Sequence, residues 1–186
     1  MENIVFKNPF ENEDLNFNKS KFTESQDKLY LYFQKDINYY LNLVQCNIDI
    51  DYKLNIFKIK IKNLIKYNKG NPEITNNVKF VKYILTNIHN ECFIYILKYM
   101  NLITNNDLFY VKNSYTLIQM EQHTLLKNNF TIFCSNFILY GNIGIINEIH
   151  NKILKLLLLP NKNNKVIIDS LFDIINLCTL LLMLYV

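Results

Sequence analysis

Side chains that could do chemistry are few in this chain, and they are widely spaced. Each of its three histidines falls on a different predicted helix, without an Asp or Glu at the spacing that a metal site or an acid–base pair needs. The three glycines form no phosphate-binding loop and no nucleophile motif. The sequence therefore predicts no catalytic residue, no metal site and no cofactor, and we expect a binding or regulatory protein. The histidines are His89, His123 and His150.

The four cysteines also argue against redox or metal chemistry. They lie some forty residues apart, and no two of them form a CxxC pair. In an apolar context this spacing indicates reduced thiols that are buried as small hydrophobic side chains. We therefore expect a reducing compartment, either the nucleus or the cytoplasm. The cysteines are Cys46, Cys92, Cys134 and Cys178.

Composition limits the class of protein further. Half of the 186 residues are apolar and 14% are aromatic, which is enough to bury a full core and excludes a wholly disordered chain. The net charge of +4 rests on 20 lysines that are spread along the chain without any arginine, so nucleic-acid binding is not indicated. Ala and Trp are absent too. This pattern is typical of A+T-rich codons, and it blurs helical periodicity because Ile and Asn fill most positions.

Apolar periodicity predicts an all-α fold. The one ambiguous segment is 49–67, where isoleucines alternate with lysines in a pattern that partly fits a strand, and we prefer a helix there because its neighbours are helical. A break is expected at Tyr67–Pro72. Glu91–Ile103 is nearly all apolar and is expected to be the buried central helix. The predicted helices are Glu24–Gln45, Asp49–Tyr67, Thr75–Ile88, Glu91–Ile103, Ser114–Phe133, Ile145–Leu159 and Val166–Val186.

The two ends of the chain differ strongly. Residues 1–22 are polar and are expected to form a flexible arm. Val166–Val186 is strongly apolar, which suits either a buried terminal helix or a membrane anchor. Asp169 and Asp173 favour the buried helix, because acidic groups are costly in a bilayer and only about 13 residues follow Asp173, too few to span it.

The segment after the break resembles a cyclin box of the P/U (phosphate-pathway) type. Pro72–Thr75 followed by Phe80–Ile84 is similar to the opening of its first helix, and Cys92–Ile103 is similar to its second helix. In the signature that ends the second helix of that family, Asn101 replaces the acid and Leu102 replaces the arginine. The resemblance covers about residues 72–160 and implies a single five-helix box.

The rest of the resemblance concerns the helices that would meet a kinase. Ser114–Lys127 looks like the third box helix, Ile132–Asn136 like the short fourth helix, and Gly144–Glu148 like the start of the fifth. Lys127 falls where such cyclins place the lysine that contacts the kinase. In place of the small residues that usually precede this lysine, the chain has Leu125 and Leu126.

The resemblance implies a regulatory subunit that binds and activates a cyclin-dependent protein kinase in cell-cycle or nutrient-signalling control. Such a subunit holds the kinase αC helix in its active position. Lys127 would donate hydrogen bonds to main-chain carbonyls of the kinase. The acid that pairs with it across the interface would fall near Lys152 or Ile153, and the nearest carboxylate is Glu148, one turn earlier. The predicted kinase interface consists of Lys127, Leu126, His123, Glu148 and Lys152.

The implied domains are a polar arm (1–22), N-terminal helices that pack on the box (23–70), the box-like domain (71–160) and the apolar C-terminal helix (161–186). Two other interpretations stay open. Asn142–Ile145 faintly resembles the start of the central helix of apoptosis regulators, although the Trp and Arg of that motif are missing. That class would bind amphipathic helices and associate with membranes. The third possibility is a structural subunit of a larger assembly.

Overall fold

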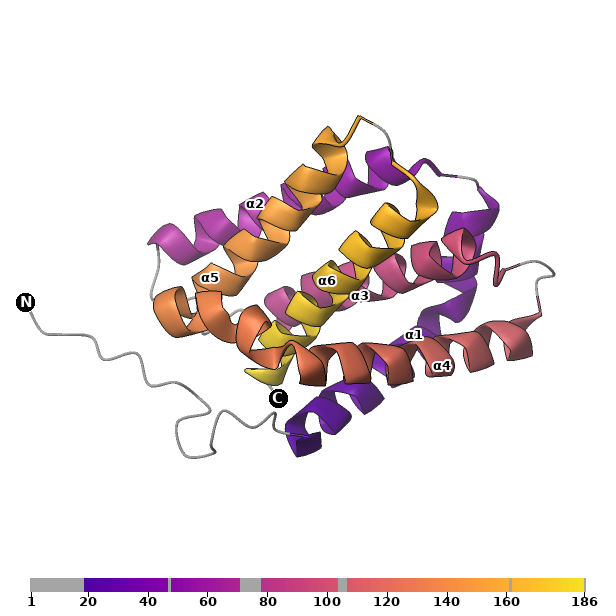
Figure 1. Cartoon of the computed structure of the whole chain (residues 1–186), viewed down its shortest axis with the longest axis horizontal. Coiled ribbons are helices and arrows are strands. Elements are labelled where there is room, and N and C mark those ends of the chain that lie inside the picture. Colours follow the sequence, from indigo (N-terminus) through magenta and orange to yellow (C-terminus); the bar gives the residue numbers. More distant parts are fainter. Residues whose placement is uncertain (1–18, 47, 71–77, 104–106, 161, 186) are drawn as a thin grey trace, which may run out of the picture.

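The chain forms a bundle of helices, and the all-α prediction is confirmed. The computed structural model describes residues 19–46, 48–70, 78–103, 107–160 and 162–185, and no strand occurs among them. In Figure 1, α6 lies in front of α3, with α2 and α5 along one side of this pair and α1 and α4 along the other. The helices are α1 (Lys19–Gln45), α2 (Ile50–Gly70), α3 (Val78–Tyr99), α4 (Leu108–Asn128), α5 (Phe130–Leu158) and α6 (Asn164–Met183).

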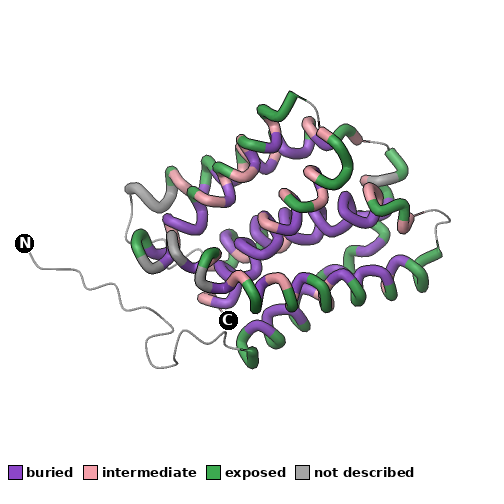
Figure 2. The backbone as a smooth tube through the Cα atoms, viewed as in Figure 1, coloured by how far each residue is buried: buried purple, intermediate pink, exposed green. Residues whose placement is uncertain are grey.

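Helix α3 is the centre of the bundle. Every residue from Ile88 to Leu97 is at most 1% exposed, so this stretch has no face toward solvent. It packs most extensively against α6 and also against α1, α2 and α4. Figure 2 shows this part of α3 as a continuous buried stretch, whereas buried and exposed positions alternate along the outer helices. The prediction that the apolar segment near position 95 forms a buried central helix is confirmed.

The continuity of α3 corrects the sequence-based division of this region. Two helices with a break near position 90 were expected, but one unbroken helix runs from Val78 to Tyr99. The polar residues at the expected break are buried rather than exposed in a turn. The helix ends where Asn101 adopts a left-handed conformation (φ 57°), and the N–H of Leu102 donates to the Leu97 carbonyl at 2.8 Å, as in a Schellman turn. The expected cyclin signature therefore lies across a helix end.

Both N-terminal segments are helical as expected, but α1 begins earlier than predicted. α1 begins at Lys19, so the last four residues of the predicted arm are helical, and Phe22 is buried; residues 1–18 lie outside the described residues. Tyr32, in the predicted helix Glu24–Gln45, is exposed. α2 is helical, as preferred, because its buried side chains recur at helical spacing, whereas Ile59 points to solvent. These buried residues are Leu54, Phe57, Ile61 and Leu64.

The boundaries of α4 and α5 follow from capping groups and one glycine. α4 begins six residues earlier than predicted, because the Asp107 carboxylate accepts from the N–H groups of Phe109 (2.9 Å) and Tyr110 (3.3 Å). The expected fourth and fifth box helices form one element, α5, that kinks at Gly141. The backbone there (φ 63°, ψ −153°) is a conformation that glycine adopts without steric cost.

The apolar C-terminal segment packs inside the bundle. α6 starts at the cap Asn163, whose side chain accepts from the N–H of Val166 at 2.9 Å. All residues from Ile174 to Met183 are buried, mostly against α3 and α5. Among the described residues α6 is the one helix long and apolar enough to cross a membrane, and 72% of its apolar window is buried in the bundle. The structure thus shows the buried-helix alternative for this segment.

A buried ion pair ties α2 to α3. The Glu91 carboxylate, 1% exposed, lies 2.8 Å from the ammonium group of Lys53, which is 8% exposed. Lys60, two turns further along the same side of α2, approaches the other carboxylate oxygen at 4.0 Å. Because both charges of the short pair are out of water, neither is tolerable without the other. The pair therefore fixes the register of α2 against α3.

The buried side chain of Asn90 connects α3 to α1, and His89 lies beside it on α3. The His89 ring nitrogen Nδ1 lies 2.8 Å from the Asn90 side-chain oxygen, and the Asn90 amide donates to the Tyr40 hydroxyl at 3.3 Å. Burial lowers the pKa of His89 to about 4, although its contact with Asn90 acts in the opposite direction. His89 is therefore neutral at pH 7.

We predict that Glu91→Gln lowers the free energy of unfolding by about 3–5 kcal/mol, because the buried Lys53 ammonium loses its counter-charge. The measurement is urea denaturation at neutral pH. The matched control is Glu24→Gln, which removes an exposed pair with Lys28 and should cost less than about 0.5 kcal/mol. Equal effects of the two substitutions would contradict the assignment of the buried pair.

We also predict that acid destabilises the fold through His89. The unfolded state takes up a proton near pH 6.5 and the folded state only near pH 4, so stability is complete above pH 6.5 and declines as the pH falls toward 4. The loss amounts to about 3 kcal/mol over this range. Urea midpoints measured from pH 7 to 4 should fall more steeply for the natural chain than for His89→Gln. Parallel curves would show that His89 does not carry the effect.

Candidate functional site

Lys127 stands at the carboxyl end of α4 and is exposed. It occupies the last turn of the helix, where a positive charge is favoured by the helix dipole. Within the described part of the chain, no carboxylate forms an ion pair with it. The lysine that the sequence singled out is therefore available to a partner.

Three apolar side chains share the outward side of α4 with Lys127. Phe109 is 72% exposed, Leu117 67% and Met120 64%. The spacings between these four positions are eight, three and seven residues, each close to a whole number of helical turns. The four side chains therefore lie along one side of the helix. We call this set, Phe109, Leu117, Met120 and Lys127, the α4 outer face. Large apolar side chains exposed together in this way are typical of interaction surfaces.

The inward side of α4 explains why the outer face remains outside the core. Val111, Tyr115, Ile118, Gln122 and Leu126 are buried at the same helical spacing. The Gln122 amide is fully buried and receives a hydrogen bond from Gln26 of α1 at 2.9 Å. It also donates to the Thr179 hydroxyl of α6 at 3.1 Å. These bonds fix the rotation of α4 and keep its outer face toward solvent.

His123 lies beside the outer face, at the junction of α4 with the first turn of α1. Its ring is stacked on that of Phe22, with the ring centroids 4.8 Å apart. The pKa of His123 is lowered, first by partial burial and then by the positive charges of Lys19 and Lys127. His123 is thus half-buried and is influenced by the positive charges of two lysines.

Leu126 is a correction to the predicted interface. Its side chain is fully buried, and its neighbour Leu125 packs partly against the core. Leu126 cannot contact a partner without unfolding of α4, and its place in the predicted interface is wrong. The physical reason is that Leu126 continues the inward stripe, four residues after Gln122.

Glu148 and Lys152 belong to another part of the molecule. Both lie on α5 beyond the Gly141 kink, in the segment that packs on α2 and α6. Lys152 pairs with Asp173 of α6 at 2.7 Å, so it holds two helices together. The structure does not bring these two residues into the same face as Lys127.

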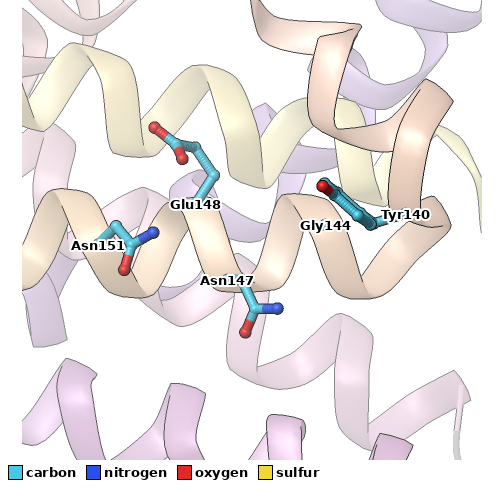
Figure 3. Close-up of a pocket in the computed structure, with 5 residues that line it drawn as sticks. All are labelled: Tyr140, Gly144, Asn147, Glu148 and Asn151. Carbon is cyan, nitrogen blue, oxygen red and sulfur yellow. The ribbon is translucent and has the colours of Figure 1, made fainter.

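Glu148 instead lines a small pocket on α5. The pocket has a volume of about 240 Å³, and all five of its lining residues come from this helix. Figure 3 shows the Glu148 carboxylate on the side of α6, with the amides of Asn147 and Asn151 on other sides of the helix. The lining side chains do not converge on one point, so the pocket lacks the geometry of a catalytic site. The other lining residues are Tyr140 and Gly144.

The remaining reactive side chains are dispersed. No group of three His, Cys, Asp or Glu residues able to hold a metal ion occurs in the described ranges. Cys92, Cys134 and Cys178 are buried, and burial raises the pKa of the Cys134 thiol to about 12, whereas Cys46 is exposed. The buried thiols are therefore protonated and unreactive at neutral pH.

The sequence missed the apolar part of the outer face. Leu117 and Ile118 are adjacent apolar residues of the predicted helix Ser114–Phe133, and Phe109 lies before the expected start of that helix. Only Ile118 continues the inward stripe, while Leu117 and Met120 fall outside it. A helical projection from position 108 would have separated the two sets. The missing signal was the Asp107 cap, which sets where the helix begins.

Comparisons with protein-family models, curated proteins and solved structures found no match.

We predict opposite outcomes for two leucines of α4. Leu126→Asp should lower the free energy of unfolding by about 4 kcal/mol or more, because it buries an unpaired carboxylate. Leu117→Asp, on the outer face, should cost less than about 1 kcal/mol. Thermal and urea unfolding of both variants is the measurement. Similar losses for the two would contradict the orientation of α4.

Proposed function

We propose that this protein is a non-catalytic regulatory subunit that docks a partner protein on the α4 outer face. The observation that carries the proposal is the row of exposed apolar side chains that ends in Lys127, a lysine without an ion pair among the residues that the structure describes. A rigid helix face with apolar contacts and one charge at its end supplies both affinity and register. The partner class that the resemblance implies is a cyclin-dependent protein kinase.

A stable complex needs more contacts than the α4 outer face alone provides. Full burial of an apolar side chain contributes about 1.5–3 kcal/mol, so three side chains that are two-thirds exposed offer about 3–6 kcal/mol. Association itself costs at least about 4 kcal/mol in lost freedom. Neighbouring residues must therefore add contacts. His123, half-buried at the end of the face, is the nearest candidate.

In the proposed complex, the α4 outer face packs on the αC region of the kinase. Lys127 donates to main-chain carbonyls there, and the apolar row excludes water around that contact. The platform holds αC where its glutamate can pair with the ATP-binding lysine. Because α4 is fixed by buried hydrogen bonds to α1 and α6, it can impose a position on αC rather than adapt to it.

The unbroken helix α3 does not match the order of helices that the cyclin resemblance implies. The resemblance implies separate first and second box helices, and the chain has one helix there. The proposal consequently depends on the α4 outer face and not on the topology of a cyclin box. Glu148 and Lys152 play no part in it.

A second candidate is a helix-binding bundle of the apoptosis-regulator kind. It is favoured by α6, an apolar helix of sufficient length to cross a membrane that is packed against the buried α3. For α6 to serve as an anchor, it would have to leave the core and break the Lys152–Asp173 pair. This class is distinguished by binding of amphipathic helical peptides and by recovery of the chain with membranes.

We predict that Lys127→Glu and Met120→Asp each weaken kinase binding at least about tenfold, equivalent to ~1.4 kcal/mol. The measurement is titration of the purified full chain against purified cyclin-dependent kinases, with kinase activity as a second readout. Both positions are exposed, so thermal stability should change little.

The matched control is Lys155→Glu, an equal charge reversal at an exposed position in the last turn of α5. It should bind as the natural chain does. The kinase proposal is wrong if no such kinase binds, or if all three variants bind alike.

A further inference from the structure

The net positive charge of the chain is concentrated in helix α2. This helix has six lysines and one acid, a net charge of +5, whereas the whole chain has a net charge of +4, so the other residues sum to −1. Lysines occur along the whole sequence, but the acids that would balance them are scarce in α2. Such a local excess indicates a surface that binds anionic groups.

The lysines of α2 lie on different sides of the helix. Lys53 and Lys60 approach the buried carboxylate of Glu91 on α3. Lys62 and Lys66 are exposed, lie one turn apart and point away from that side. The first two lysines hold α2 on the bundle, whereas the exposed two have no such role in the fold.

Two exposed apolar side chains share the outward side of α2 with these lysines. Tyr52 is 61% exposed and Ile59 58%. We call the set of Tyr52, Ile59, Lys62 and Lys66 the α2 outer face. The spacings between its successive members are seven, three and four residues, each close to a whole number of turns, so the four side chains form one row.

The acids nearest in the fold are engaged elsewhere. Asp51, the acid of α2 itself, pairs with Lys162. The helices that pack on α2 are α3 and α5, and each has one acid. On α3 this is the buried Glu91, and on α5 it is Glu148, which Figure 3 shows on the side of α6. The ion pairs of the described residues therefore leave the lysines of the α2 outer face without a carboxylate.

We propose that the α2 outer face binds the surface of a membrane that contains anionic lipids. In the bound state, Lys62 and Lys66 lie at the level of the charged headgroups, and Tyr52 and Ile59 enter the boundary between headgroups and acyl chains. The association is peripheral, because the bundle stays folded and α6 stays in its core. It does not depend on the function proposed for the α4 outer face.

Three features favour a membrane over other anionic partners. The row lies on the outward side of one helix, so it is convex, and a fluid surface accommodates it without a matching groove. Apolar side chains next to lysines are stabilised in the headgroup region, whereas the phosphates of a nucleic acid offer them no contact. Lysine is a point charge that suits a field of many headgroups, and arginine, whose planar fork suits paired contacts to one phosphate, is absent from the chain.

Membrane binding through α2 is compatible with a partner protein on α4. The two helices lie on opposite sides of the central pair formed by α3 and α6 (Figure 1). A chain bound through the α2 outer face therefore keeps its α4 outer face away from the bilayer.

Sedimentation of the purified full chain with lipid vesicles tests the proposal. We expect binding to vesicles of phosphatidylcholine and phosphatidylserine, and at least about tenfold weaker binding to vesicles of phosphatidylcholine alone. In about 1 M salt the binding should fall to the weaker level, because the Debye length is then about 3 Å. Equal binding to both kinds of vesicle would overturn the proposal, because it would indicate insertion of an apolar segment. Binding to DNA or to an acidic peptide, with none to either vesicle, would also overturn it.

Charge removal locates the contact. Lys62→Gln combined with Lys66→Gln should weaken binding to the anionic vesicles about 25-fold, which is about fivefold or ~1 kcal/mol for each lysine. The matched control is Lys35→Gln combined with Lys112→Gln, which removes the same charge from α1 and α4 and should bind nearly as the natural chain does. Equal losses in the two double variants would refute the α2 outer face, because net charge alone would then explain the binding.

A single tryptophan reports which face meets the bilayer. The chain has no Trp, so Tyr52→Trp introduces one reporter on the α2 outer face. On the anionic vesicles its emission should shift to shorter wavelength and be quenched by brominated lipid. Tyr39→Trp, at an exposed position of α1, is the matched control and should show neither effect. The same response from both reporters, or from neither, would contradict the proposed contact.

Discussion

Enclosure of α3 is the constraint on which the rest of the structure depends. A helix that is buried all round from Ile88 to Leu97 needs neighbours on every side, and α1, α2, α4 and α6 supply them. The polar groups in this stretch must then find partners in the surrounding helices, because an unpaired polar group in the interior is costly. Asn90 finds Tyr40 on α1, and Glu91 finds Lys53 on α2. Apolar burial thus drives assembly, and the polar pairs select one arrangement.

The same logic separates the two sides of α4. Its inward side is held by the buried bonds of Gln122 to α1 and α6, which leaves little freedom of rotation. The apolar side chains of the outer face contribute nothing to the central packing, so the needs of the core do not explain why they are apolar. An apolar surface on a rigid element is suited to binding a protein.

How far the site could be predicted differs from residue to residue. Lys127 was expected at an exposed position near the end of a helix, and the structure has it there. Leu126, its neighbour, was misplaced because adjacent helical residues point about 100° apart and the inward side had not been identified. Glu148 and Lys152 were joined to Lys127 by a resemblance that assumes separate box helices. The Gly141 kink, which directs the second half of α5 toward α2 and α6, removes them from that face.

The sequence by itself determined the helical class and the buried character of the segment around position 95. These properties follow from local composition and periodicity, which act over one or two helical turns. Only the tertiary structure decided that 78–99 is one helix, that α6 lies in the core and that α4 turns Leu117 and Met120 outward. Each of these depends on contacts between residues far apart in the chain, such as Gln122 with Thr179, whose energies no local pattern encodes.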